Sequence, residues 1–360
     1  MRVGEDPRMI PRASAIALSV LAFCSACPAQ EGIVDKDDKG TWVLAYFRQR
    51  YEGRVEIDAQ GKEHQVPLPD PMAVEQLHLA TSQDGRNWTP LNDNKPVWQQ
   101  RLRDPFVRRA ADGMWHLMGT GAGRLRKPED RDAGPVCLHA VSKDLITWDL
   151  AEALPLMKGV KDDEGRSAGN IWAPEWFADP KSGDTILLWS STFEDTGWKK
   201  SRLWYSRTKD WKTFTPAQVL FAPPYSVIDG TLLEKDGKYY LFHKEEEFSR
   251  ATGERRAIRV ATADSVEGPY TIHEGPLNKG QIVPVITEGP GIMPDPQGSG
   301  WLLLYDYCMT NRFGLSSSKD LFNWTIEEQV NFPADARHGS AFKVDGEELG
   351  KLKAAAWPQE

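Results

Sequence analysis

The sequence predicts an all-β fold, a five-bladed β-propeller, and three observations lead to this prediction. A short motif that ends in an aromatic residue occurs five times, at steps of 54 to 63 residues. β-Branched and aromatic runs of strand length fill the chain from Trp42 onward. No stretch of 12 or more residues shows the 3.6-residue apolar period of an amphipathic helix. A repeat of this length is typical of one supersecondary unit that buries its apolar face only against its neighbours.

The repeated motif has the form Ser-x-Asp…Trp, and it predicts a hairpin at the end of each unit. Its copies are Ser82–Trp88, Ser142–Trp148, Ser206–Trp211, Ala263–Tyr270 and Ser318–Trp324. An Asp-Gly or Ser-Gly turn precedes most copies, as at Asp112-Gly113 and Asp236-Gly237, where Gly supplies a positive φ. Units of about 60 residues with four strands match a propeller blade better than a sandwich.

The predicted strands follow one another in this order along the chain, each bounded by Gly, Asp or Pro. They are Trp42–Phe47, Gln76–Ser82, Met114–Thr120, Val136–Ser142, Thr185–Ser191, Arg202–Arg207, Tyr239–Lys244, Ala257–Ala263, Trp301–Cys308 and Phe313–Ser318. The longest irregular stretches, 51–74, 121–135 and 158–170, are rich in Gly, Pro and charge. We expect them to form surface loops around one mouth of the ring.

The two ends of the repeat region are expected to meet in one blade. The first unit, Trp42–Trp88, lacks an opening strand, and Arg337–Val344 has the pattern of that missing strand. Strands from both termini would then close the ring, which removes an exposed sheet edge. Because no linker interrupts the repeats, we expect residues 40–350 to form a single domain.

The N-terminus has the pattern of an export signal. A basic flank precedes the apolar stretch Ala13–Phe23, and small residues follow it up to Ala29. This stretch is too short to span a bilayer comfortably, so we expect residues 1–29 to be a cleaved signal peptide and the protein to be periplasmic or extracellular. Lipid anchoring at Cys27 is the alternative. No later segment reaches the length of a membrane span.

Composition excludes several classes of partner. The net charge is −8 and no block of Lys and Arg forms a basic patch, which argues against nucleic acid. Cys137 and Cys308 lie in apolar strand patterns, so we expect buried free thiols rather than a disulfide. No Cys/His cluster has zinc-ligand spacing. No cofactor is expected to be required, and we expect a monomer.

One ionisable residue occurs in each of the five blades, at the start of its first strand. In a propeller the first strands line the central channel. The five residues are Asp104, Glu175, Asp229, Glu288 and His338. Carboxylates crowded in a channel repel one another and resist desolvation, so a purely structural role is a poor explanation. Such crowding raises the pKa of one member and prepares an acid and a base in one site.

At these residues the chain resembles the family 43 glycoside hydrolases, five-bladed propellers that cleave arabinose- and xylose-containing glycans with inversion. The resemblance covers roughly residues 40–345 and rests on RDPF at Asp104, Trp-Ala-Pro at 172–174, IDGT at Asp229, EGP at Glu288 and RHGS at His338. It implies an ionised Asp104 as general base and a Glu288, kept protonated by nearby negative charge, as general acid. Asp229 would raise the pKa of Glu288 and orient it.

The resemblance also implies roles in binding an oligo- or polysaccharide. His338 would contact a hydrated metal ion such as Ca²⁺ or position the base; a histidine hydrogen-bonded at ring closure is the alternative. Arg312 would contact the base or a sugar hydroxyl, and Trp172 and Trp176, which flank Glu175, would stack on sugar rings. Glu175 is a fourth acid that many family members lack, and Arg-His-Gly replaces the common Gly-His-Gly.

Two other functions fit part of the pattern. A retaining fructan or sucrose hydrolase of the related propeller type would share Arg103-Asp104-Pro105 and Glu175, but the first blade offers no Asn-Asp-Pro nucleophile. A non-catalytic carbohydrate-binding propeller is the second. The sequence identifies neither the sugar, whether arabinofuranosyl, xylosyl or galactofuranosyl, nor exo- or endo-action.

Overall fold

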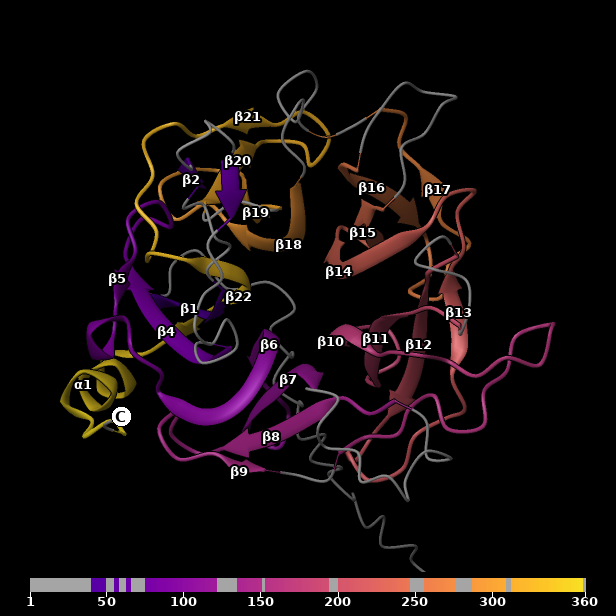
Figure 1. Cartoon of the computed structure of the whole chain (residues 1–360), viewed down its shortest axis with the longest axis horizontal. Helices are drawn as coiled ribbons and strands as arrows, with labels where there is room; N and C mark the ends of the chain where they lie inside the picture. Colours follow the sequence, from indigo (N-terminus) through magenta and orange to yellow (C-terminus); the bar gives the residue numbers. More distant parts are fainter. Residues whose placement is uncertain are drawn as a thin grey trace, which may run out of the picture. The chain divides into compact units, whose positions relative to one another are not determined.

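The computed structural model describes residues 40–49, 55–57, 63–65, 75–121, 135–150, 153–193, 200–246, 256–275, 277, 287–308 and 312–358. Within them the strands form five antiparallel groups in chain order, which confirms the predicted five-bladed β-propeller (Figure 1). The predicted signal peptide, with Cys27, lies outside the described residues. No helix in the described part is long and apolar enough to cross a membrane.

Four blades are continuous in sequence, and each runs from its first to its fourth strand. Blade 2 consists of β6 (Trp98–Arg109), β7 (Trp115–Gly121), β8 (Leu138–Ser142) and β9 (Asp149–Leu150). Blade 3 consists of β10 (Trp172–Ala178), β11 (Thr185–Ser191), β12 (Arg202–Thr208) and β13 (Gln218–Phe221). Blade 4 consists of β14 (Val227–Lys235), β15 (Lys238–Glu245), β16 (Ile258–Ala263) and β17 (Thr271–Ile272). Blade 5 consists of β18 (Thr287–Pro294), β19 (Trp301–Tyr307), β20 (Arg312–Ser318) and β21 (Thr325–Ile326).

Blade 1 combines both ends of the repeat region, as predicted. Its strands are β22 (Ala336–Val344), β1 (Thr41–Arg48), β4 (Gln76–Ser82) and β5 (Thr89–Pro90). β1 pairs with β22 from Thr41 opposite Val344 to Arg48 opposite Ala336. This pairing gives the backbone groups of β1 a partner on the side that β4 leaves open.

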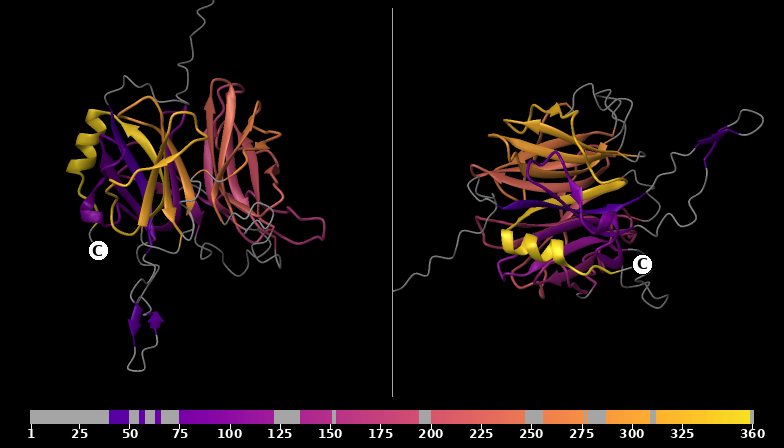
Figure 2. Two further views of the ribbon diagram at one scale, coloured as in Figure 1. Left: turned by 90° about the horizontal axis from the view of Figure 1, so that it is seen from above. Right: turned by 90° about the vertical axis from the view of Figure 1, so that its left-hand side faces the viewer.

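Three features differ from the expected pattern. The first residues of β6 also pair with β4, so blades 1 and 2 form one continuous sheet. The stretch 51–74, expected to be irregular, contains the paired strands β2 (Val55–Ile57) and β3 (Glu63–Gln65). A helix that the sequence did not predict, α1 (Gly346–Ala354), follows β22 and lies at the outer edge in Figure 2.

The helix α1 is short but well capped. The Asp345 carboxylate accepts from the Glu348 N–H, while the Glu348 carboxylate accepts from the Asp345 N–H, which is a capping box. Leu352 is fully buried in the apolar cluster of blades 1 and 2. One buried residue in nine leaves too weak a periodic pattern to predict from sequence. A 3₁₀ turn, η1 (Asn92–Asn94), follows β5.

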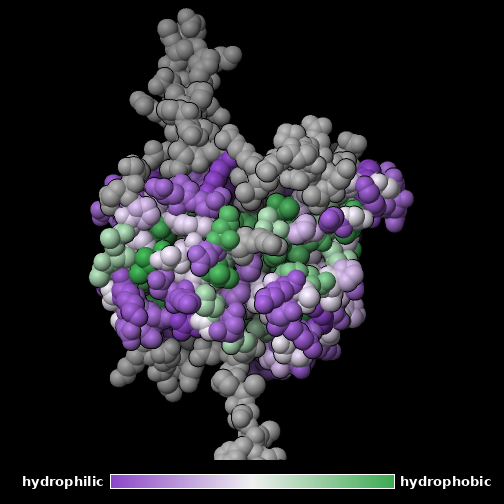
Figure 3. Space-filling model, turned by 90° about the horizontal axis from the view of Figure 1, so that it is seen from below, coloured by the Kyte–Doolittle hydropathy of each residue, from purple (hydrophilic) through white to green (hydrophobic). Residues whose placement is uncertain are grey.

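The repeated motif packs as a hairpin with a fixed internal bond. The indole N–H of Trp88, Trp148 and Trp324 donates to the carbonyl three residues earlier, at 3.0–3.2 Å. In the Ala263–Tyr270 copy the Tyr270 hydroxyl donates to the Val266 carbonyl at 2.7 Å. The motif is therefore a packing device at the outer part of the blade. On the face seen in Figure 3 hydrophilic and hydrophobic residues are interspersed, and of the described large apolar residues Leu150 and Val219 are exposed.

Candidate active site

The first strand of every blade carries a β-bulge at the same place. In β6, β10, β14 and β18 the pairing with the second strand skips two residues, and in β22 the register skips His338. The first skipped residues are Asp104, Ala173, Asp229, Gly289 and His338. Four of them have a φ between 43° and 64°. A bulge turns the side chain away from the regular alternation of the strand, and such bulges are frequent next to active sites.

The pairing between the first and second strands shows which of the expected acids occupy equivalent positions in their blades. Asp104 and Asp229 occupy the same bulge position, two blades apart. Glu288 lies one residue before that position, and Glu175 lies two residues after it. Each first strand contacts the first strand of the next blade, and β22 contacts both β6 and β18. Equivalent bulges therefore bring these side chains together at one level of the propeller.

In three blades the second strand supports the bulge of the next blade. Thr120, Ser190, Lys244 and Asp306 occupy the same register position in β7, β11, β15 and β19. Thr120 accepts from the Ala173 N–H at 2.9 Å, Ser190 from the Asp229 N–H at 3.0 Å, and Asp306 from the His338 N–H at 3.1 Å.

Lys244 breaks this rule, because an ammonium group has no acceptor to offer. The N–H of Gly289, which follows in the next blade, donates instead to Asp229 Oδ2 at 3.1 Å. Lys244 turns to the carboxylate of Glu288, with its Nζ 2.7 Å from Oε2. One substitution in the repeat thus fixes the orientation of Asp229 and gives Glu288 a cationic partner.

Asp104 is held as a carboxylate. Its Oδ1 lies 3.4 Å from His338 Nδ1, and its Oδ2 accepts a short hydrogen bond from the Thr120 hydroxyl. Burial raises the pKa of Asp104, but the hydrogen bond and charge of His338, with Arg103 and Thr120, hold that pKa well below its usual range. Burial lowers the pKa of His338, yet Asp104, Asp229 and Glu175 together raise it to about 10. The two residues form an ion pair.

Glu288 contacts two cations, whereas the resemblance implies that nearby negative charge keeps it protonated. Lys244 contacts its Oε2, and Arg337 makes a short ion pair with its Oε1. The side chains of Lys244 and Arg337 are only 2% and 3% exposed. Burial raises the pKa of Glu288, but these two cations lower it to about 2. The direction is opposite to the protonated state that the resemblance implies, and both carboxylate oxygens are engaged.

Two other carboxyl groups have raised pKa values. Burial raises the pKa of Asp229 to about 6 against the opposing charge of His338, and the charge of Glu288 adds to the rise. Burial likewise raises the pKa of Glu175 to about 7, although Thr231, His338 and Arg108 oppose it. Asp229 Oδ2 accepts the Gly289 N–H, whereas no hydrogen bond from the described residues engages Oδ1. Asp229 thus has an oxygen available to carry a proton.

Asp306 was not predicted. It is fully buried on β19 opposite Glu288, and its Oδ2 lies 2.9 Å from Arg337 Nε. Burial and the charge of Glu288 raise its pKa to about 7, against the charge of Arg337. An acid inside the apolar run of 301–308 was the signal that could have revealed it.

The predicted binding residues lie in different surroundings. Trp172 is half-buried and lines a pocket. Trp176 is 4% exposed and packs edge-on against Phe106 and Trp211 inside the core, so it offers no face to a sugar. Arg312 lies at the exposed start of β20, with its guanidinium 4.8 Å from the centre of the Tyr307 ring.

Cys137 and Cys308 are free, as expected, but of these two only Cys137 is buried. Cys137 is buried in the core, whereas Cys308 is half-buried beside Glu288. Burial raises the pKa of the Cys308 thiol to about 12, and the charge of Glu288 adds to this rise against the charge of Lys244. Cys308 is therefore a neutral thiol rather than a nucleophile.

A hydrated metal ion at His338 stays a prediction, because such an ion takes many of its oxygen ligands from water. Within the described ranges no group of three or more His, Cys, Asp or Glu side chains is placed to hold a metal ion. His338 serves as the cationic partner of Asp104.

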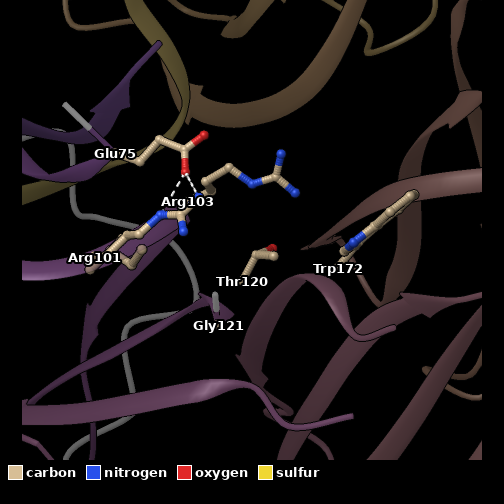
Figure 4. A pocket seen from close by; sticks show the side chains of 7 residues that line it. Glu75, Arg101, Arg103, Thr120, Gly121 and Trp172 are labelled. Atoms are coloured by element: carbon tan, nitrogen blue, oxygen red, sulfur yellow. Dashed lines mark hydrogen bonds and ion pairs between the residues drawn. The ribbon is translucent and has the colours of Figure 1, made fainter. Parts of the chain in front are cut away.

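A pocket of about 300 Å³ opens beside Asp104. It is lined by Glu75, Arg101, Leu102, Arg103, Thr120, Gly121 and Trp172. Thr120 joins the pocket to the site, because its hydroxyl also donates to Asp104. Figure 4 shows Trp172 on one side of this space and the ion pair of Arg101 with Glu75 on the other.

Three solved structures are among those to which the chain is similar. A thermostable family-43 glycoside hydrolase is 15% identical, with 66% of this chain and 78% of that chain covered and a TM-score of 0.48. An endo-arabinase from Bacteroides thetaiotaomicron is 20% identical, covering 68% and 85%, with a TM-score of 0.49. A family 43 β-1,3-galactosidase is 13% identical, covering 79% and 99%, with a TM-score of 0.49. A search among curated proteins finds no sequence match.

A family model gives the decisive comparison. The model of a family related to glycoside hydrolase family 43, described as a probable glycosyl hydrolase domain, matches residues 70–350. This range runs from before β4 to within α1, and it includes every bulge residue described above. The chain belongs to this family of glycosyl hydrolases.

Proposed function

We propose that the protein is an inverting glycoside hydrolase that cleaves terminal arabinofuranosyl, xylosyl or galactofuranosyl bonds of plant-type or related polysaccharides. One observation carries this proposal. Asp104 is held ionised and Asp229 is readily protonated, and the two occupy equivalent bulges two blades apart. A carboxylate and a carboxylic acid on different blades are the groups that an inverting mechanism needs.

Asp104 is the general base. Its ion pair with His338 keeps it unprotonated, so that it accepts a proton from the water that attacks the anomeric carbon. An inverting pair leaves room for that water, with carboxyl groups roughly 6.5–9.5 Å apart. β10 contacts both β6 and β14, so Asp104 and Asp229 lie on first strands that are separated by a third one.

We assign the proton donor to Asp229 and not to Glu288. Glu288 has Lys244 on one oxygen and Arg337 on the other, and both cations favour the ionised form of this carboxylate. Burial and the charge of Glu288 raise the pKa of Asp229, so Asp229 holds a proton at a higher pH than an ordinary carboxyl group does. The proton passes from Asp229 to the leaving oxygen, while the proton of the attacking water passes to Asp104. Glu288 acts on Asp229 through its negative charge, so the two roles expected from the resemblance are exchanged.

A leaving-group series tests this assignment. Removing a general acid costs about 10²–10⁴-fold with poor leaving groups, because they require protonation, and much less with activated aryl glycosides. We expect Asp229→Asn to show this selective loss and Glu288→Gln to lose activity on both substrate types to a similar extent. The opposite pattern would return the donor role to Glu288. NMR of the first-formed anomer checks the stereochemistry, and retention would refute the inverting reaction.

Export remains part of the proposal. Residues 1–29 would direct the protein to the periplasm or the exterior, where polysaccharide is available. Mass spectrometry of the mature N-terminus tests this and distinguishes plain cleavage from a lipid on Cys27.

A further inference from the structure

We propose that the pocket beside Asp104 binds a negatively charged sugar substituent through Arg103, so that the substrate is an acidic glycan carrying a carboxylate or a sulfate. This inference rests on the proposed function, and it names the substrate class for the same site.

Arg103 occupies a special register position. It is the last paired residue before the bulge, equivalent to Trp172, Ile228, Glu288 and Arg337 in the other blades. The two other charged residues at this level, Glu288 and Arg337, pair with each other. Arg103 makes no hydrogen bond or ion pair with the described residues, although it is half-buried.

The remaining charges around the pocket are balanced. Arg101 donates to Glu75 Oε2 through Nε at 3.0 Å and through its terminal nitrogen at 2.6 Å. Asp104 is paired with His338. Of the charged residues that line this space, Arg103 is thus the one that makes no ion pair with another lining residue, although its charge also acts on the adjacent Asp104. In Figure 4 its guanidinium extends into the open part of the pocket, between Glu75 and Trp172.

The chemistry of this group favours an anion over a neutral hydroxyl. A guanidinium presents five N–H donors in a planar fork that matches two oxygens of a carboxylate or a sulfate. The Thr120 hydroxyl is already committed, since it donates to Asp104 and accepts from the Ala173 N–H. A neutral sugar would leave the Arg103 guanidinium without a direct ionic partner in a partly enclosed site.

Trp172 provides the second half of the site. It lines the same pocket from the next blade, at the register position of Arg103, and it is half-buried. An indole face packs against the apolar face of a sugar ring. A volume of about 300 Å³ lies at the lower end of the range for ligand pockets and suits one sugar residue. Because the pocket adjoins Asp104, the charged residue would lie next to the bond that is cleaved.

The test measures binding without turnover. The Asp104→Asn variant of the full chain is titrated calorimetrically with a uronic-acid oligosaccharide, its carboxyl-reduced neutral counterpart and a sulfated oligosaccharide. We expect the uronic-acid or the sulfated oligosaccharide to bind with roughly tenfold to a hundredfold higher affinity than the neutral one. A charge-assisted bidentate hydrogen bond contributes about this much. Comparing the uronate with the sulfated sugar identifies which anion the pocket takes.

Matched variants assign the effect to Arg103. Adding Arg103→Met to this variant should abolish the preference for the acidic sugar. Arg103→Lys should retain part of the preference, because lysine keeps the positive charge but lacks the planar set of N–H donors of the guanidinium. Lys319→Met removes an equal charge from an exposed position in blade 5 and should change nothing. Circular dichroism checks that each variant is folded, and Arg103→Lys still tests the proposal if Arg103→Met does not fold.

The outcomes separate this inference from the proposed function. Equal binding of acidic and neutral sugars, or a preference that survives Arg103→Met, overturns the acidic-glycan inference. Hydrolysis of neutral glycosides by the wild type would then still support the proposed hydrolase. Binding that depends on Arg103, with no hydrolysis of any glycoside by the wild type, would support the site and refute the hydrolase.

Discussion

Replacing Lys244 by Met removes one of the two cations that hold Glu288 ionised. The Lys244 Nζ lies 2.7 Å from Glu288 Oε2, and the lysine side chain is 2% exposed. Breaking a buried ion pair by removing one partner typically costs about 3–5 kcal/mol. The variant should unfold at a lower urea concentration at pH 7, and the loss should depend on pH.

The sign of that dependence follows from the depressed pKa of Glu288. In the wild type the pKa falls from 4.5 in the unfolded chain to about 2, which contributes about 3 kcal/mol of stability at neutral pH. This contribution is complete above pH 4.5 and is lost as the pH falls through about 2. In Lys244→Met the pKa rises because burial is then opposed by Arg337 and the hydrogen bond of Cys308 without the charge of Lys244, so the variant lacks much of this contribution.

Urea unfolding at several pH values between 7 and 3 measures the difference between the two proteins. We expect the difference in the free energy of unfolding to be largest near pH 7 and to shrink below pH 4.5. Lys181→Met is the matched control, because Lys181 is exposed and donates to two backbone carbonyls rather than to a carboxylate. A difference for Lys244→Met that stays constant over this pH range would refute the ion-pair account of Glu288.

Three further predictions concern the base, the bulge and the hairpin. His338→Gln removes the cation beside Asp104, so the acidic limb of the kcat/KM profile should move to higher pH by at least about one unit; an unmoved limb would contradict the pairing. Gly289→Ala should reduce activity strongly, since its Cβ would lie 2.6 Å from His338 Cγ at a φ of +64°; normal activity in a kinetic assay would argue against this contact. Trp88→Ala should destabilise the fold by about 3–5 kcal/mol in urea unfolding, because Trp88 is fully buried and bonded to the Gly85 carbonyl, and a loss below 1 kcal/mol would contradict its packing role.

The blades were predictable because one strong local signal marks each of them. Trp88, Trp148 and Trp324 each close a hairpin through a hydrogen bond to the carbonyl three residues earlier. The whole hairpin motif is therefore visible in a short stretch of sequence. The pairing of β22 with β1 followed from the missing opening strand of the first blade. The helix α1 lacked such a signal, since one buried residue sets no period.

The bulges explain why Trp176 was misplaced. Trp172 and Trp176 are four residues apart, and in a regular strand they would point to the same face. The bulge adds one residue between Trp172 and Glu175 and reverses the alternation. Trp172 therefore lines the pocket while Trp176 enters the core. A one-residue bulge of this kind leaves little trace in a single sequence.

The charge state of Glu288 was equally hidden. Its two cations come from β15 and β22, 44 and 49 residues away in sequence. The sequence revealed that acids recur once per blade, but not that Lys244 replaces the acceptor found in three other blades. The charges of residues on neighbouring strands determine whether the pKa of a carboxyl group is raised or lowered. These charges therefore decide which acid carries the proton.

Carbon-13 NMR titration of the side-chain carboxyl groups tests the central assignment most directly, with Asp229→Asn and Glu288→Gln used to identify the two signals. The account predicts that Asp229 titrates at a pKa of about 6 and that Glu288 stays ionised down to about 2. A Glu288 carboxyl that titrates between pH 6 and 7, with Asp229 ionised throughout, would contradict it.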